Sequence, residues 1–132
     1  MQIQDSIDCA IQILQYLHKH QEAVQAGPVI AKALGISHAI LIRLTSPLEK
    51  KGLLTFARGR NGGYALGKPA HEISFYDVFT AVEGEPWIYP YLKDGRQCTN
   101  GERAGCKVHE FLQTVQGNMI AELSGKPIAD LV

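Results

Sequence analysis

Three cysteines are the side chains of this 132-residue sequence best suited to redox or metal chemistry. They are Cys9, Cys98 and Cys106. An odd and low number of cysteines does not suggest a disulfide framework. The thiols are therefore expected to be buried apolar groups, a redox switch or metal ligands.

The two later cysteines lie among positive charges, which lower the pKa of a thiol and make it more reactive. The neighbouring basic residues are Arg96, Arg103 and Lys107. A disulfide between Cys98 and Cys106, or between Cys9 and one of them across a dimer, is one predicted response to an oxidant. A thiol switch in this segment is the first hypothesis for sensing.

Enzyme motifs are absent from the sequence. There is no phosphate-binding glycine loop ahead of a helix, no pair of carboxylates with a cleft to serve, and no nucleophile motif. Cys106 and His109 on one helix are not a protease arrangement. We therefore predict that the protein is not an enzyme.

Positive charge is concentrated in one short segment, although the whole chain has a net charge of zero. Residues 43–68 carry six Lys or Arg and one Glu, a net charge of +5. Residues 1–42 come to −1 and residues 69–132 to −4. An anionic partner such as a nucleic acid is expected to meet the central segment.

Two short helices are predicted just before and within this basic segment. Residues 27–34 have helical apolar spacing, with Pro28 in the first turn and Gly35 as a stop. Ser37 is typical of the N-cap of a second helix that ends near Gly52. The pair forms a helix-turn-helix.

Pro47 lies inside the second helix, where it removes a hydrogen-bond donor and clashes with the preceding turn. A kink or break is therefore expected near Ser46. The first half of the helix, residues 37–45, could still enter a DNA groove.

A β-hairpin follows. Residues 53–57 are predicted to form a strand, residues 58–63 a turn with several positions suited to positive φ, and residues 64–66 the return strand. Helix, helix, turn, helix and hairpin is the order of a winged helix domain. The predicted fold is mainly α (α+β), a winged helix-turn-helix.

This order predicts which residues contact DNA. A helix presents side chains from its N-terminal half to the major groove, whereas a basic hairpin can reach phosphates and the minor groove. The groove candidates are Ser37, His38 and Arg43, and the phosphate candidates are Lys50 and Lys51. The hairpin candidates are Arg58, Arg60, Asn61, Gly62 and Gly63.

The chain divides into three predicted parts. Residues 1–84 form the winged helix-turn-helix domain, residues 85–106 a cysteine-containing sensor loop, and residues 107–132 a dimerisation helix and tail. A long apolar stripe on the last helix predicts a homodimer, since a lone chain of this size would struggle to cover it. Without a membrane span or a secretory signal in the sequence, we expect a cytoplasmic protein.

Several stretches resemble the Rrf2 family of bacterial winged-helix regulators. The most specific is residues 58–66, Arg-Gly-Arg-Asn-Gly-Gly-Tyr-Ala-Leu; residues 36–37, 48–54 and 72–84 also match. The resemblance covers about residues 1–125. It implies a homodimer held by the long C-terminal helix, operator DNA as the target, and often a sensor in the cysteine loop.

The resemblance also raises an iron–sulfur cluster as the alternative sensor. Many family members use three cysteines, with five residues between the first two and seven between the last two. Cys98 and Cys106 match the last pair, but the first position falls at Leu92, which cannot ligate iron. Asp8 and His109 are the candidates for extra ligands, since such sites can also use residues other than cysteine.

The function predicted from these observations is a transcription regulator that binds operator DNA as a dimer. Two-fold symmetry predicts an inverted repeat with half-sites one or more helical turns apart. Repression is expected by default for a small regulator of this kind. The alternative is a winged-helix module that binds proteins and not DNA.

Overall fold

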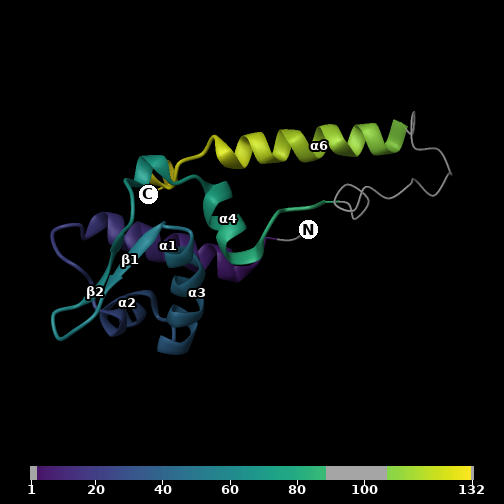
Figure 1. The fold of residues 1–132 in the computed structure, drawn as a ribbon. Coiled ribbons are helices and arrows are strands. Elements are labelled where there is room, and N and C mark those ends of the chain that lie inside the picture. Colours follow the sequence, from purple (N-terminus) through teal and green to yellow (C-terminus); the bar gives the residue numbers. More distant parts are fainter. Residues whose placement is uncertain (1–2, 89–106, 132) are drawn as a thin grey trace.

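The computed structural model describes residues 3–88 and 107–131. The elements in order are α1 (Asp5–Lys19), α2 (Gly27–Leu34), α3 (His38–Lys50), β1 (Leu54–Ala57), β2 (Gly63–Leu66), η1 (Ala70–Glu72), α4 (Phe75–Glu83), α6 (Lys107–Ser124) and η2 (Ile128–Leu131). Figure 1 shows α1 to α4 gathered into one body, from which α6 extends as a long rod. The predicted class, mainly α with a small sheet, is confirmed.

One apolar cluster holds the body together, and α1 runs through it. Ile7, Leu14 and Leu17 of α1 recur at helical spacing and are fully or almost fully buried. They meet apolar side chains from α2, α3, both strands and α4. Burial of such side chains is the main favourable term for folding, at about 1.5–3 kcal/mol each.

The helix-turn-helix forms as predicted. Helix α2 carries Pro28 in its first turn and is followed by Gly35, which has the left-handed φ of 68°. Ser37 then caps α3, and its hydroxyl accepts a hydrogen bond from the Ile40 N–H at 3.1 Å. These two short-range signals fix the turn between the helices.

The sequence predicts a kink or break near Ser46; helix α3 does not break at Pro47, so the expectation of a break is wrong. The helix is continuous from His38 to Lys50. Its buried side chains lie on both sides of the proline: Leu41, Leu44 and Thr45 before it and Leu48 after it. Packing of both halves against the same core offsets the cost of the missing donor.

The strands β1 and β2 form an antiparallel hairpin in which Leu54 pairs with Leu66 and Ala57 with Gly63. Only Gly59 of the turn has a positive φ, at 107°, so the expectation of several such positions is wrong. Gly62 and Gly63 are required for a different reason. An added Cβ would collide with the backbone of Ala57 at the first and of Gln25 at the second.

The chain after α6 returns to the body. Ile128 of η2 is fully buried, and its N–H donates to the Ile73 carbonyl at 2.8 Å. The Phe75 N–H donates to the Lys126 carbonyl at 2.9 Å. This return completes the core beside α1 and α4, and nothing in the sequence pattern predicts it.

Among the described residues, no single helix is long and apolar enough to cross a membrane. Helices α2 and α3 together reach that threshold by length and composition, but they meet at a bend of 112°.

Candidate nucleic-acid interface

The exposed side of α3 is the first component of the site. Its buried side chains anchor the helix to the core, which leaves His38, Ile42 and Arg43 exposed on its first turns. His38 and Ile42 are four residues apart and therefore share one face. The N-terminal half of this helix thus offers a donor group, an apolar group and a positive charge.

The hairpin is the second component, which we call the wing (residues 54–66). Arg58, Arg60 and Asn61 are all exposed at its turn. In Figure 1 the turn projects from the body at the end of the molecule opposite the start of α6. Both arginines are therefore free to reach a partner that lies against α3.

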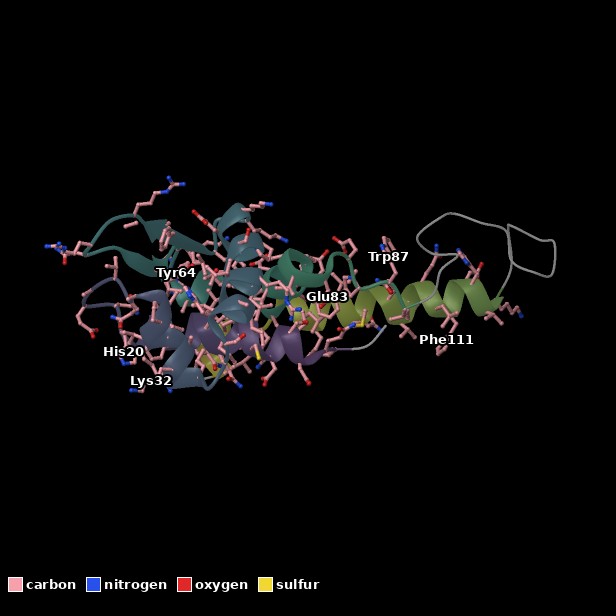
Figure 2. All side chains as sticks on the ribbon, turned by 90° about the horizontal axis from the view of Figure 1, so that it is seen from below. His20, Lys32, Tyr64, Glu83, Trp87 and Phe111 are labelled. Atoms are coloured by element: carbon pink, nitrogen blue, oxygen red, sulfur yellow. The ribbon has the colours of Figure 1, made fainter. Side chains whose placement is uncertain are left out.

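Tyr64 fixes the wing to the rest of the body. Its side chain is 6% exposed, and the Thr45 hydroxyl of α3 donates to its hydroxyl oxygen at 3.3 Å. Its backbone exchanges two hydrogen bonds with Gln25, at 2.7 and 2.8 Å. Figure 2 shows Tyr64 inside the body, at the base of the wing. The angle between wing and α3 is thereby set by buried contacts.

A hollow of about 310 Å³ lies where the wing, α3 and the start of α2 meet, and we call it the junction hollow. His38 and Ile42 of α3 line it, as do Phe56 and Arg60 of the wing. The structure therefore brings two predicted contact residues with polar side chains, His38 and Arg60, to one place. Gly62 and Gly63 also line it, although Gly63 is buried and serves the close approach described above.

The remaining predicted contacts lie apart from this hollow. Arg43 lines a separate hollow of about 280 Å³ with Ser6 and Glu83, whose side chains are hydrogen bonded at 2.7 Å. Lys50 is exposed at the end of α3. Lys51 donates to the Thr80 hydroxyl of α4, so it connects the end of α3 to the body.

Ile42 and Phe56 were not predicted as site residues. Both are large apolar side chains left exposed, at 48% and 45%. The signal for Ile42 was available, since it follows His38 by one helical turn on the predicted groove face. Phe56 could not be found this way, because strand alternation does not say which face the wing turns toward α3.

The candidate sensor residues are only partly described. Cys98 and Cys106 lie outside the described residues. Cys9 of α1 is half-buried against the core, and the Asp8 carboxylate accepts a hydrogen bond from Gln12 at 2.9 Å. His109 is half-buried on α6. Within the described ranges, no three His, Cys, Asp or Glu side chains lie together as metal ligands.

Comparison with known proteins decides the family. The model of the Rrf2 family, described as an iron-dependent transcriptional regulator, matches residues 3–132. The chain belongs to the Rrf2 family. It is therefore a DNA-binding transcriptional regulator and not an enzyme.

Curated relatives agree with this assignment. The protein aau3 of Rhizobium meliloti is 36% identical over 130 residues, which cover 93% of this chain and 84% of that protein. The HTH-type transcriptional regulator IscR of Serratia proteamaculans is 36% identical over 112 residues, 82% of this chain and 66% of that one. The IscR relative is thus longer than this chain.

Solved structures confirm the winged-helix fold. CymR, the global cysteine regulator of B. subtilis, superimposes with a TM-score of 0.77 and 26% identity, covering 99% of this chain and 95% of that one. IscR of T. potens gives a TM-score of 0.75 at 21% identity and covers 99% and 85%. At 21% identity, the similarity to IscR of T. potens is evidence for the fold alone.

Proposed function

We propose that this Rrf2-family regulator is a homodimeric repressor that recognises an inverted-repeat operator. Helix α3 enters the major groove, and the wing reaches the neighbouring minor groove. The observation that carries the proposal is the junction hollow, in which His38 of α3 and Arg60 of the wing line one surface. Arg60 belongs to the segment of residues 43–68, whose net charge is +5, and His38 lies five residues before that segment begins.

The side chains divide by the part of DNA they can read. His38 and Arg43 project from the first turns of α3, where they can donate to base edges. Arg58 and Arg60 at the wing turn carry charge suited to the negative potential of a narrow minor groove. Lys50 can contact phosphates and fix the register. Ser37, Lys51, Asn61, Gly62 and Gly63 complete the proposed contact set.

Helix α6 supports the dimer. Its side chains Val108, Phe111 and Val115 are 59%, 65% and 36% exposed. Figure 2 shows Phe111 projecting outward from α6, and Figure 1 shows the helix standing away from the body. A second copy of the chain would cover this apolar face. Its two-fold axis would place two copies of α3 on two symmetric half-sites.

We propose that the protein is cytoplasmic and that it senses oxidants through a thiol switch. Two cysteine thiols reduce one molecule of hydrogen peroxide. The O–O bond breaks and an S–S bond forms, and the two electrons and two thiol protons go to the oxygens, which leave as two water molecules. The pair is Cys98 with Cys106, or Cys9 with one of them in the partner. The basic residues near Cys98 and Cys106 in the sequence, which favour a reactive thiolate, and Leu92 in place of a third loop cysteine support this choice.

An iron–sulfur cluster is the alternative sensor, favoured by the iron dependence in the family description. It would need Cys98 and Cys106 together with Asp8, Cys9 or His109. Protein purified without oxygen separates the two sensors. Iron, sulfide and visible absorbance in stoichiometric amounts support the cluster. Colourless protein that releases DNA with peroxide, but not after Cys98→Ser together with Cys106→Ser, supports the switch.

Selection from a random duplex library tests the DNA-binding proposal. The full chain should enrich an inverted repeat and bind it as a dimer. Arg58→Ala with Arg60→Ala should abolish the enrichment, whereas Lys19→Ala with Lys126→Ala, two exposed lysines outside the basic segment, should preserve it. Failure to enrich any duplex, with the protein folded, would support the protein-interaction module instead.

A further inference from the structure

The face that α3 and the wing present to DNA contains an apolar patch. Ile42 is 48% exposed and Phe56 is 45% exposed, and both line the junction hollow. Single exposed apolar side chains are common on protein surfaces. Two of them line one hollow on the face that also carries basic side chains. We therefore expect the partner to place an apolar group in this hollow.

The patch is held in place from below. The ring of Phe56 lies against that of Tyr64, with centroids 4.8 Å apart. Tyr64 is in turn hydrogen bonded to Thr45, which belongs to the same helix as Ile42. The strand that carries Phe56 and the helix that carries Ile42 are thus linked through Tyr64 and Thr45, so burying the two side chains in a complex requires little movement of the backbone.

The chemistry of DNA limits what can fill such a patch. Base edges in the major groove present donors and acceptors, and the C5-methyl group of thymine is the apolar exception. His38 of α3 lines the same hollow and can donate to an acceptor next to that methyl group. An apolar wall with a donor beside it therefore matches the major-groove edge of a thymine.

We propose that Ile42 and Phe56 form a thymine-reading surface that receives one C5-methyl group in each half-site. This inference rests on the proposed DNA-binding function and adds a base preference to it. Ile42 supplies the contact from α3, and Phe56 closes the hollow on the side of the wing. The regulator should therefore distinguish thymine from uracil at one position of each half-site.

Replacement of thymine by deoxyuridine is the direct test, because it removes only the methyl group. Each thymine of the selected operator is replaced in turn, and the Kd is measured with the full chain. We expect one position per half-site to bind about fourfold more weakly, the factor for burial of one methyl-sized group. All other positions should be unaffected.

Variants then assign the effect to the patch. Ile42→Ala or Phe56→Ala should bring the thymine-to-uracil ratio at that position close to one. The matched control is Ile40→Ala: this isoleucine is on the same helix, is 37% exposed and does not line the hollow. It should keep the fourfold ratio.

Two results would overturn the inference while the proposed function stands. One is duplex binding with no thymine-to-uracil difference at any position. The other is a thymine-to-uracil ratio that stays near fourfold in Ile42→Ala and Phe56→Ala, although each variant binds both duplexes more weakly. That result would mean that the patch contacts a part of the DNA that thymidine and deoxyuridine share, such as the sugar. Absence of binding to any duplex would refute the proposed function itself.

Discussion

Gln116 is predicted to be the most important polar side chain of α6 for stability. It is 6% exposed, its Nε2 donates to the Pro86 carbonyl at 2.7 Å, and its Oε1 accepts from the Ile88 N–H at 3.0 Å. Both partners belong to the segment that follows α4 and leads into the cysteine region. One side chain therefore fixes that segment to the long helix.

Gln116→Leu keeps the bulk but removes both hydrogen bonds. Pro86 is buried, so its carbonyl loses its partner without gaining water, at about 1–3 kcal/mol. Ile88 is half-buried, and loss of its hydrogen bond adds about 0.5–1.5 kcal/mol. The free energy of unfolding should therefore fall by about 1.5–4.5 kcal/mol.

Urea unfolding at a fixed protomer concentration measures the change, since the stability of the proposed dimer would depend on concentration. The control is Gln113→Leu, an exposed glutamine on the same helix, which should change stability by less than about 0.5 kcal/mol. Gln116→Glu should also destabilise at neutral pH, because a carboxylate cannot donate to the Pro86 carbonyl. Equal midpoints for Gln116→Leu and Gln113→Leu would refute the reasoning.

Three further predictions concern the body of the fold. Gly63→Ala should lower the free energy of unfolding by about 1–3 kcal/mol, because the new Cβ collides with backbone atoms. Gly117→Ala, in open space on α6, should instead raise it by about 0.5–1 kcal/mol. Thermal unfolding of the two variants checks this, and equal shifts of the midpoint would contradict it. Ser74→Ala should cost about 1 kcal/mol by removing the capping box of α4, as measured by urea unfolding against the exposed control Ser124→Ala. The hydrogen bond to the Glu85 carboxylate, followed by burial, raises the pKa of Tyr76 from 10.0 to about 12. The stability that this bond contributes should therefore be present below pH 10 and lost between pH 10 and 12, so the difference in unfolding free energy between the wild type and Tyr76→Phe should shrink in that range; a difference independent of pH would exclude it.

The helix-turn-helix and the hairpin could be predicted because short-range signals specify them. The left-handed Gly35 and the N-cap Ser37 fix the turn, and their roles depend on a few neighbouring residues. The expected break at Pro47 failed for the opposite reason. Helix propensity accounts only for the hydrogen-bond donor that proline lacks. Leu44 and Leu48, on either side of Pro47, hold the helix to the core, and their burial depends on partners that are distant in the sequence.

The candidate site was predictable in its charges and not in its shape. Arg58 and Arg60 could be found from composition and the glycine-rich turn. The junction hollow depends on the buried contact between Tyr64 and Thr45, which sets the wing against α3. Local patterns carry no information on that angle, so Phe56 could not be assigned to the interface.

The salt dependence of operator binding tests the central claim most directly. The logarithm of the affinity should fall linearly with the logarithm of the salt concentration, and the slope counts the phosphate charges that the protein neutralises. We predict that Arg58→Ala with Arg60→Ala flattens this slope by about one for each arginine, with a matching loss of affinity at low salt. An unchanged slope and affinity in the double variant would contradict a wing that contacts DNA.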